Sequence, residues 1–355
     1  MPLATCLPEY LETGASAART RCVSSIEAYD DALTKSALSQ VNRLLAQTDG
    51  PYTLEAAVTV LLLCLTELCD GTSRVWKWHL KAARTLLTSG GTSGLERTTE
   101  GTFCLNLFHY LDSMSTISRC KPPLLHQGNS LADLTTNPQT TFTTSSAESI
   151  GGMAPALLDL LGTVNLLAAH RSRRVDDLSE IGFRTAAASV QAQLDTWRAS
   201  YNESLMDEGT VYNRDADSAT TAFEWAVRLR LHQIVEGYDT RHGTVETAIE
   251  QILQATLSIP YGSPVEGSLL FPLVIAGASS TETEERMVVK ERLIVMESTL
   301  GFGHIPRARE LLEVVWAEEE SNWARVRYSQ FPGVVFIQSH GKGPGLGWAE
   351  YDNWT

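Results

Sequence analysis

The residues that could do chemistry are aromatic and hydrogen-bonding side chains that fall on predicted helices. His79 follows Trp76 by one turn on the apolar stripe of its helix. A histidine and a carboxylic acid are common proton-transfer groups, so His79 and Asp112 are the candidate catalytic residues if the protein is an enzyme. The candidate ligand-binding residues are aromatic or imidazole side chains on several helices: Trp76, Tyr110, Trp225, His232 and Phe271. Helices that carry such groups on their inner faces favour one semi-polar pocket for a small molecule, with Trp76 buried beside Phe271.

These side chains also have a purely structural interpretation, which stays open. A lone histidine on an apolar stripe is usually a hydrogen-bonded core residue, and aromatic side chains at helical spacing usually fill a core. Other histidines, among them His109, are expected beside loops or on polar faces. The sequence contains no H-E-x-x-H, no G-x-S-x-G and no phosphate-binding loop, so enzymatic activity is neither indicated nor excluded.

No metal and no cofactor are expected. The six cysteines form no C-x-x-C pair, which argues against a zinc site. Asp176, Asp177 and Glu180 resemble the aspartate-rich magnesium element of class I terpene cyclases, which are also all-α. The second metal element of those enzymes has no counterpart, because the spacing that begins at Asp217 reaches Trp225 instead of a carboxylate. Acidic residues in the first turn of a helix favour its dipole, and this interpretation is preferred.

Apolar residues recur at helical spacing along almost the whole chain. The clearest stripes begin at Leu54, Trp76, Phe103, Met153, Phe183, Phe223, Val245, Val289 and Leu312. Helices over 54–68 and 76–87 are predicted to form an antiparallel hairpin, and only 334–337 looks extended. The expected fold is therefore all-α, a multi-helical array of packed antiparallel helical hairpins.

Two segments fall outside this helical pattern. Residues 121–149 are rich in Pro, Thr, Ser and Asn, and they are expected to form a long loop, either a lid or a disordered insertion. Residues 331–355 are expected to form an irregular tail that is rich in glycine, aromatic and acidic residues. The expected organisation is a single helical domain over 1–330, followed by this tail.

The balance of charge limits the partners. The net charge is −14, from 28 Lys and Arg against 42 Asp and Glu. Proteins that bind nucleic acid rely on Lys and Arg to neutralise phosphates, so this chain is not expected to bind DNA directly. The sequence shows no leader segment and no apolar run long enough for a membrane span. The expected location is the nucleus or the cytoplasm.

Four helical segments follow one another along the chain: Trp76-Lys-Trp-His79-Leu80-Lys-Ala-Ala83, Phe108-His-Tyr110-Leu-Asp112, a core helix over Leu269–Gly277 that Pro272 interrupts, and Leu312-Glu-Val-Val-Trp316. Taken in this order, they resemble the fungal-specific transcription factor domain, which is the helical regulatory region of zinc-cluster regulators. The resemblance covers about residues 54–323. The resemblance implies an all-helical regulatory domain without fixed catalytic residues. It also implies partners: a small hydrophobic or semi-polar metabolite, and protein co-regulators or a second copy of the chain.

The zinc cluster of those regulators is missing from this sequence. The module needs six closely spaced cysteines and a basic flank, whereas residues 1–50 contain only Cys6 and Cys22. The expected function is regulatory, without DNA binding by this chain, which is either part of a longer regulator or a complete protein. The alternative is a cofactor-free isomerase or cyclase of fungal secondary metabolism, in which a shaped cavity and one or two polar groups suffice.

Overall fold

The computed structural model describes residues 54–70, 75–89, 98–116, 122–126, 155–205, 213–237 and 242–317, together with Ser36, Ser39, Arg43 and Leu131. Every regular element in these residues is a helix, which confirms the predicted all-α class. No helix among them is long and apolar enough to cross a membrane. The predicted tail over 331–355 lies outside the described residues, and so does the predicted loop over 121–149 apart from 122–126 and Leu131.

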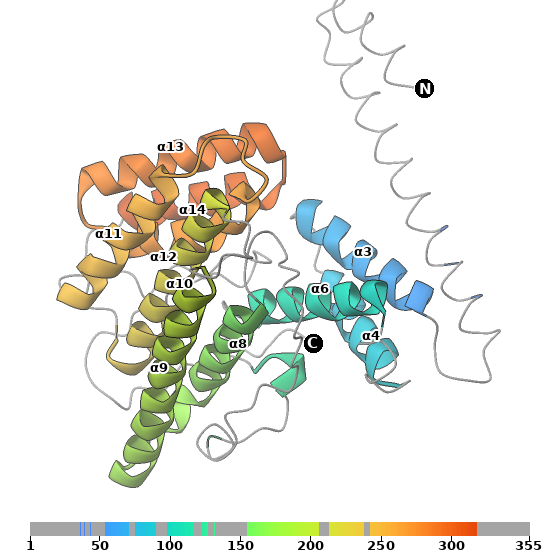
Figure 1. Cartoon of the computed structure of the whole chain (residues 1–355), viewed down its shortest axis with the longest axis horizontal. Helices are drawn as coiled ribbons and strands as arrows, with labels where there is room; N and C mark the ends of the chain where they lie inside the picture. The colour runs from blue at the N-terminus through green and yellow to red at the C-terminus, as the bar shows by residue number, and fades with distance from the viewer. Residues whose placement is uncertain are drawn as a thin grey trace, which may run out of the picture.

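The described α-helices range from 10 to 29 residues in length. Their bounds are α3 (Leu54–Asp70), α4 (Trp76–Ser89), α6 (Thr99–Thr116), α8 (Pro155–His170), α9 (Asp177–Leu205), α10 (Arg214–Val235), α11 (Gly243–Leu257), α12 (Leu270–Ser279), α13 (Thr283–Leu300) and α14 (His304–Ala317). Short 3-10 helices are η1 (Leu124–His126), η2 (Arg171–Arg173) and η3 (Glu266–Leu269). In Figure 1, α3, α4 and α6 lie on one side of the molecule, α11 to α14 lie on the other, and α8 to α10 lie between them.

Helices α3, α4 and α6 bury their apolar faces against one another. The stripe of α3 includes Leu61, and the stripe of α4 includes Trp76 and Leu80. These side chains join Phe108 and Leu111 of α6 in one hydrophobic cluster, which we call the N-terminal core. Helices α3 and α4 pack closely against each other, as the predicted hairpin requires.

A larger hydrophobic cluster, which we call the main core, is built by α8 to α14. Every residue of α12 is buried in it. Pro272 is the third residue of α12, where a missing N–H costs nothing because the first N–H groups of a helix have no partner within it. The expected interruption by Pro272 is therefore wrong, and η3 leads directly into α12.

Gly277 lets α12 approach α13 and α14 closely. A Cβ atom on this residue would lie 2.9 Å from Val289 Cγ1, which is too close, and 3.1 Å from Leu312 Cδ1, which is a tight contact. The indole N–H of Trp316 donates to the Gly277 carbonyl oxygen over 2.8 Å. Glycine at this position therefore sets the separation of α12 from its neighbours, and Trp316 sets the register of α14.

A buried ion pair connects η3 to α13. Arg292 Nη2 lies 3.1 Å from Glu266 Oε1, and the two side chains are 6% and 0% exposed. Arg292 also donates to the carbonyl oxygens of Ile259 and Pro260 over 2.9 and 3.3 Å. The second oxygen of Glu266 accepts from the Thr299 hydroxyl over 3.0 Å. The pair thus ties the segment between α11 and α12 to α13.

Two polar junctions join the N-terminal core to the main core. At the first, the Gly303 N–H donates to the Cys69 carbonyl oxygen over 2.7 Å, and His304 Nδ1 lies 3.1 Å from the Leu68 carbonyl oxygen. Carbonyls in the last turn of a helix have no partner within it, so the start of α14 completes the end of α3. The second junction lies between α6 and α8.

Candidate functional site

The structure places Trp76 and Phe271 in different cores. Trp76 belongs to the N-terminal core. Phe271 belongs to the main core, where its ring centroid lies 5.1 Å from that of Phe223. Both side chains are buried, but the expected contact between them is wrong. Helical spacing indicates which face of a helix is buried and does not indicate which other helix covers it.

The remaining candidate ligand-binding residues are also divided between the two cores. Trp225 and His232 lie on α10, where Trp225 packs against the main core. The His232 ring lies 4.6 Å from that of His242, at the start of α11. Tyr110 on α6 packs against both cores, and burial raises its pKa to about 12. The candidate residues therefore lie in two separate cores and do not line one common pocket.

Asp112 has a structural task. Its side chain is buried, and its two oxygens accept the backbone N–H groups of Leu124 and Leu125 over 2.8 and 2.9 Å. The carboxylate thereby holds the first turn of η1 against α6. Burial raises the pKa of Asp112 to about 6, and the two N–H donors and the charge of Arg84 act in the opposite direction.

Asp112→Asn is expected to remove one contribution that makes stability fall with rising pH between about pH 4 and 6, so the slope in this window becomes less negative than in the wild type. An unfolded aspartic acid loses its proton near pH 3.9, whereas Asp112 in the folded protein keeps it up to about pH 6. Because the folded state binds more protons in this window, this group makes the free energy of unfolding fall as pH rises, by up to about 1.4 kcal/mol per pH unit. Urea unfolding of both proteins at several pH values measures the slopes, and equal slopes would contradict the raised pKa.

His79 lies on α4 and is buried. Burial lowers its pKa, which favours the neutral imidazole, although the charge of Glu67 acts in the opposite direction. Both oxygens of Asp112 accept backbone N–H groups of η1. The described hydrogen bonds of Asp112 therefore do not support proton transfer between it and His79.

A histidine–carboxylate pair does occur, between residues that the sequence did not single out. His109 Nε2 on α6 lies 3.0 Å from Asp159 Oδ1 on α8, and the side chains are 8% and 12% exposed. Burial raises the pKa of Asp159 to about 7. The expected position of His109 beside a loop or a polar face is wrong, because most of α6 is buried. The sequence did contain a signal of this buried pair, because Asp159 is the single acidic residue of an apolar helix.

Asn165 extends this contact between α6 and α8. Its amide nitrogen donates to the Ser113 carbonyl oxygen over 2.8 Å and to the Thr116 hydroxyl over 3.1 Å. The Ser113 hydroxyl donates to the Leu158 carbonyl oxygen over 3.4 Å. We call these contacts between α6 and α8, which involve His109, Asp159, Ser113, Thr116 and Asn165, the polar seam. Buried hydrogen bonds of this kind specify one relative position of two helices, so the polar seam aligns the two cores.

A hollow of about 380 Å³ lies where α8 ends and α9 begins. Its lining is mostly apolar, and it consists of Leu131, His170, Arg173, Arg174, Ser179, Gly182, Phe183 and Thr185. A Cβ atom on Gly182 would meet nothing within 4 Å, so this glycine leaves open space beside α9. The volume falls within the range of small-molecule sites, about 300–1,000 Å³. None of the candidate residues predicted from the sequence lines this hollow.

Arg174, which lines the hollow, ties the start of α9 to the end of α10. Its guanidinium binds both oxygens of Glu180, one of them over 2.7 Å. Its Nη1 donates to the carbonyl oxygens of Ile234 and Val235 over 3.3 and 3.1 Å, in the last turn of α10. The guanidinium also lies 4.7 Å from the centroid of the Phe183 ring. One side chain therefore contacts the hollow, α9 and α10.

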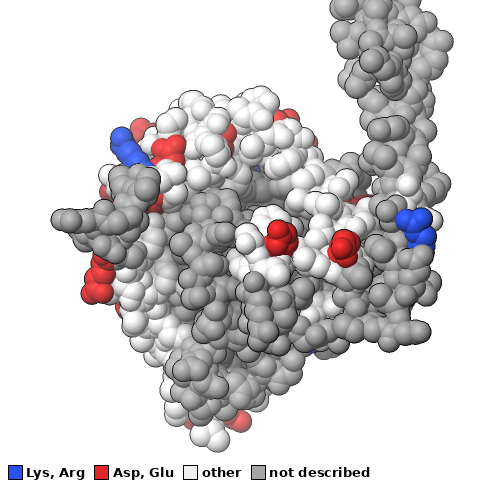
Figure 2. Space-filling view, turned by 45° about the vertical axis from the view of Figure 1, so that its right-hand side comes forward, with Lys and Arg blue, Asp and Glu red and all other residues white. Residues whose placement is uncertain are grey.

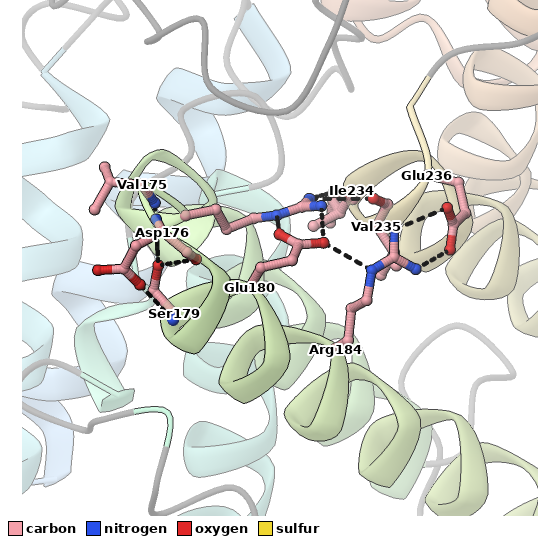
Figure 3. A network of polar contacts seen from close by, with 9 residues as sticks. Val175, Asp176, Ser179, Glu180, Arg184, Ile234, Val235 and Glu236 are labelled. Carbon is pink, nitrogen blue, oxygen red and sulfur yellow. Dashed lines mark hydrogen bonds and ion pairs between the residues drawn. The ribbon is translucent and has the colours of Figure 1, made fainter.

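Arg184 extends the network along α9 (Figure 3). It donates to Glu180 Oε1 over 2.7 Å and to the two oxygens of Glu236 over 2.7 and 3.2 Å. Hydrogen bonds from Arg174 and Arg184 lower the pKa of Glu180, and those from Arg184 lower the pKa of Glu236. These carboxylates are therefore charged at neutral pH, and they keep α9 and α10 connected.

Asp176 caps α9. Its Oδ1 accepts from the Ser179 N–H over 2.7 Å, and the Ser179 hydroxyl accepts from the Asp176 N–H over 3.1 Å (Figure 3). This reciprocal arrangement is that of a capping box. The acidic element thus begins a helix, with Asp177 and Glu180 in its first turn. In the part of the chain that the structure describes, no group of three or more His, Cys, Asp or Glu could hold a metal ion.

Comparison with known families gives one result. The sequence matches the family described as fungal specific transcription factor domain over residues 15–332. No curated protein and no solved structure matches the chain. The family match includes both cores, the polar seam and the hollow.

Proposed function

Because the chain belongs to the family of fungal-specific transcription factor domains, which gives it a role in transcription regulation, we propose that it senses a small molecule at the hollow between α8 and α9. The ligand is small and hydrophobic or semi-polar, since apolar lining surrounds a few hydroxyl and basic groups. The observation that carries the proposal is that Arg174 both lines the hollow and bonds to the end of α10. A transcription regulator acts in the nucleus, which is the proposed location.

DNA contact is proposed to be made by another polypeptide or segment, and not by the described helices. The chain has a net charge of −14, which opposes the phosphate backbone. On the face shown in Figure 2, the charged side chains of the described residues are scattered, and they form no broad basic patch on that face. Regulation by this chain therefore depends on contacts with other molecules.

A ligand in the hollow can affect the main core through the hydrogen bonds of Arg174. A ligand beside Arg174 changes the surroundings of a guanidinium that bonds to Glu180 and to the last turn of α10. Helix α10 packs against α8, α9, α11 and α12, so a change at its end reaches most of the main core. A ligand that binds one arrangement of these helices more tightly shifts the population towards that arrangement.

Gly182→Leu is expected to block the hollow without disturbing the fold. The new side chain enters open space at an exposed position, and replacing a glycine within a helix favours the helix. The probe is 1-anilinonaphthalene-8-sulfonate, an apolar aromatic anion that fluoresces strongly when it leaves water. Titration of the full chain should show one saturable site in the wild type and at least about tenfold weaker binding in the variant.

Ala192→Leu is the matched control, because Ala192 is an exposed residue of the same helix that does not line the hollow. It should bind the dye as the wild type does, and equal binding by all three proteins would reject the hollow as the site. The full chain fused to an unrelated DNA-binding domain should change expression of a reporter gene, and Gly182→Leu should alter this response. A fusion without effect on the reporter would reject the regulatory role.

The alternative function, a cofactor-free isomerase or cyclase, has less support. It needs His79 and Asp112 in a common cavity. The Asp112 carboxylate is buried and bonded to the start of η1, and the hollow is lined by neither residue. No described contact therefore favours this chemistry over the regulatory role.

A further inference from the structure

The solvent side of α4 carries an exposed tryptophan. Trp78 is 70% exposed, whereas Trp76, two residues earlier, is 2% exposed. Tryptophan is enriched where proteins bind one another, because it offers a large apolar surface with few rotatable bonds. We define the α4 outer face as the exposed residues Val75, Trp78, Lys81, Ala82 and Thr85.

This face is held in a fixed position. On the opposite side of α4, Trp76, Leu80 and Ala83 are buried in the N-terminal core. The Lys81 ammonium lies 5.0 Å from the centroid of the Trp78 ring, so the cation and the aromatic surface are presented together. Groups that are ordered before binding lose little conformational entropy on binding, which favours affinity.

The charge of α4 is opposite to that of the whole chain. The helix contains Lys77, Lys81 and Arg84 and no acidic residue, whereas the chain has a net charge of −14. The three basic residues are spaced at i, i+4 and i+7, so they form one stripe beside Trp78. Lys81 is the exposed member of this stripe, whereas Lys77 and Arg84 are half-buried and the charge of Arg84 acts on Asp112. The result is a local basic surface with an aromatic anchor.

We propose that the α4 outer face binds an acidic peptide segment of a partner protein, in which an apolar side chain packs on Trp78 and a carboxylate faces Lys81. Complementary charge steers such a segment to this face, and the tryptophan supplies the apolar contact. The inference goes beyond the ligand-sensing role of the hollow and does not depend on it, because it rests on a different helix.

Two other occupants fit this face less well. A second copy related by twofold symmetry would bring the same basic stripe against itself. Duplex DNA needs many phosphate contacts for affinity, and α4 offers three basic residues on a strongly acidic chain. An acidic peptide satisfies both the charge and the exposed ring.

The test uses the full chain and a fluorescent synthetic peptide of 16 residues, with glutamates and leucines at helical spacing, and its twin with glutamine for every glutamate. Fluorescence anisotropy should show at least about tenfold tighter binding of the acidic peptide, and added salt should weaken it. Trp78→Ala and Lys81→Glu should each weaken binding about tenfold or more. Both positions are exposed, so the thermal unfolding midpoint should stay that of the wild type.

Leu178→Ala and Arg214→Glu are the matched controls, since they change an exposed apolar and an exposed basic residue that lie far from α4 in the sequence and do not line the hollow. Both should bind the acidic peptide as the wild type does. Equal binding of the two peptides, or full binding by Trp78→Ala, would overturn the proposal. Binding of a DNA duplex that Lys81→Glu abolishes would reassign the face to nucleic acid. Gly182→Leu should leave peptide binding unchanged, so failure here and failure of the ligand-sensing role are separable.

Discussion

Arg292→Met is expected to lower the free energy of unfolding by about 3–5 kcal/mol, because it leaves the buried Glu266 side chain without its cation. The Glu266 side chain is 0% exposed, and Arg292 Nη2 lies 3.1 Å from it. Methionine keeps most of the volume of the arginine stem, so the loss arises from charge and hydrogen bonds. Two backbone carbonyls, those of Ile259 and Pro260, lose their donor as well. Urea unfolding followed by circular dichroism measures the change.

The double variant Glu266→Gln/Arg292→Met separates the ion pair from packing. Its cost should be clearly smaller than the sum of the two single costs, because no isolated charge remains in the core. Lys290→Met is the surface control, since Lys290 is 47% exposed and pairs with the half-exposed Glu313. A change within about 1 kcal/mol is expected there. A loss below about 1 kcal/mol for Arg292→Met would show that water reaches Glu266 and that the pair is not buried in solution.

Trp76→Ala is expected to cost about 3–5 kcal/mol, because it removes a large aromatic side chain from the N-terminal core. Trp76 is 2% exposed, and alanine would leave a cavity between α3, α4 and α6. The same unfolding experiment tests it.

Trp78→Ala is the matched control, with the same change of side chain two residues away on the exposed side of the same helix. Its cost should stay within about 0.5 kcal/mol. Similar costs for the two variants would mean that α4 does not bury the face on which Trp76 lies.

Helical spacing was sufficient to predict most described helices and their buried faces. The stripe that begins at Phe183 continues through Val190 and Leu194, and all three are buried. It failed at Phe103, which is 52% exposed at the start of a predicted stripe. Helix α6 contacts α3 and α4 on one side and α8 on another, so its apolar residues do not mark a single stripe.

The partners of each buried face could not be predicted. Burial of apolar surface is not directional, so the stripes of α4 and α12 carry no information about whether Trp76 and Phe271 meet. Directional contacts carry more information, and an acidic residue in an apolar helix, such as Asp159, signals a buried polar partner. Its partner, His109, is recognised only once α6 and α8 lie side by side.

The hollow could not be predicted either, because it depends on the angle between two consecutive helices, α8 and α9, and on Leu131, which comes from an earlier segment. Leu131, the end of α8 and the start of α9 contribute to it. Its one local signal is Gly182, a glycine between Leu178 and Thr185 on one face of α9. A glycine in the interior of a helix lowers the stability of the helix by about 1 kcal/mol relative to alanine. A glycine at this position is therefore consistent with a functional role for the open space beside it.

The junction between α3 and α14 has a consequence for the order in which the protein folds during its synthesis. Leu68 and His304 are 236 residues apart. At synthesis rates of about 5–20 residues per second, α3 leaves the ribosome roughly 12–47 s before the element that completes its last turn. During that interval the Leu68 and Cys69 carbonyl oxygens lack the His304 and Gly303 contacts, and water can take their place. The apolar face of α3 does not have to wait, because α4 and α6 follow it closely in the sequence. The end of α3 is thus completed only after the start of α14 has been synthesised.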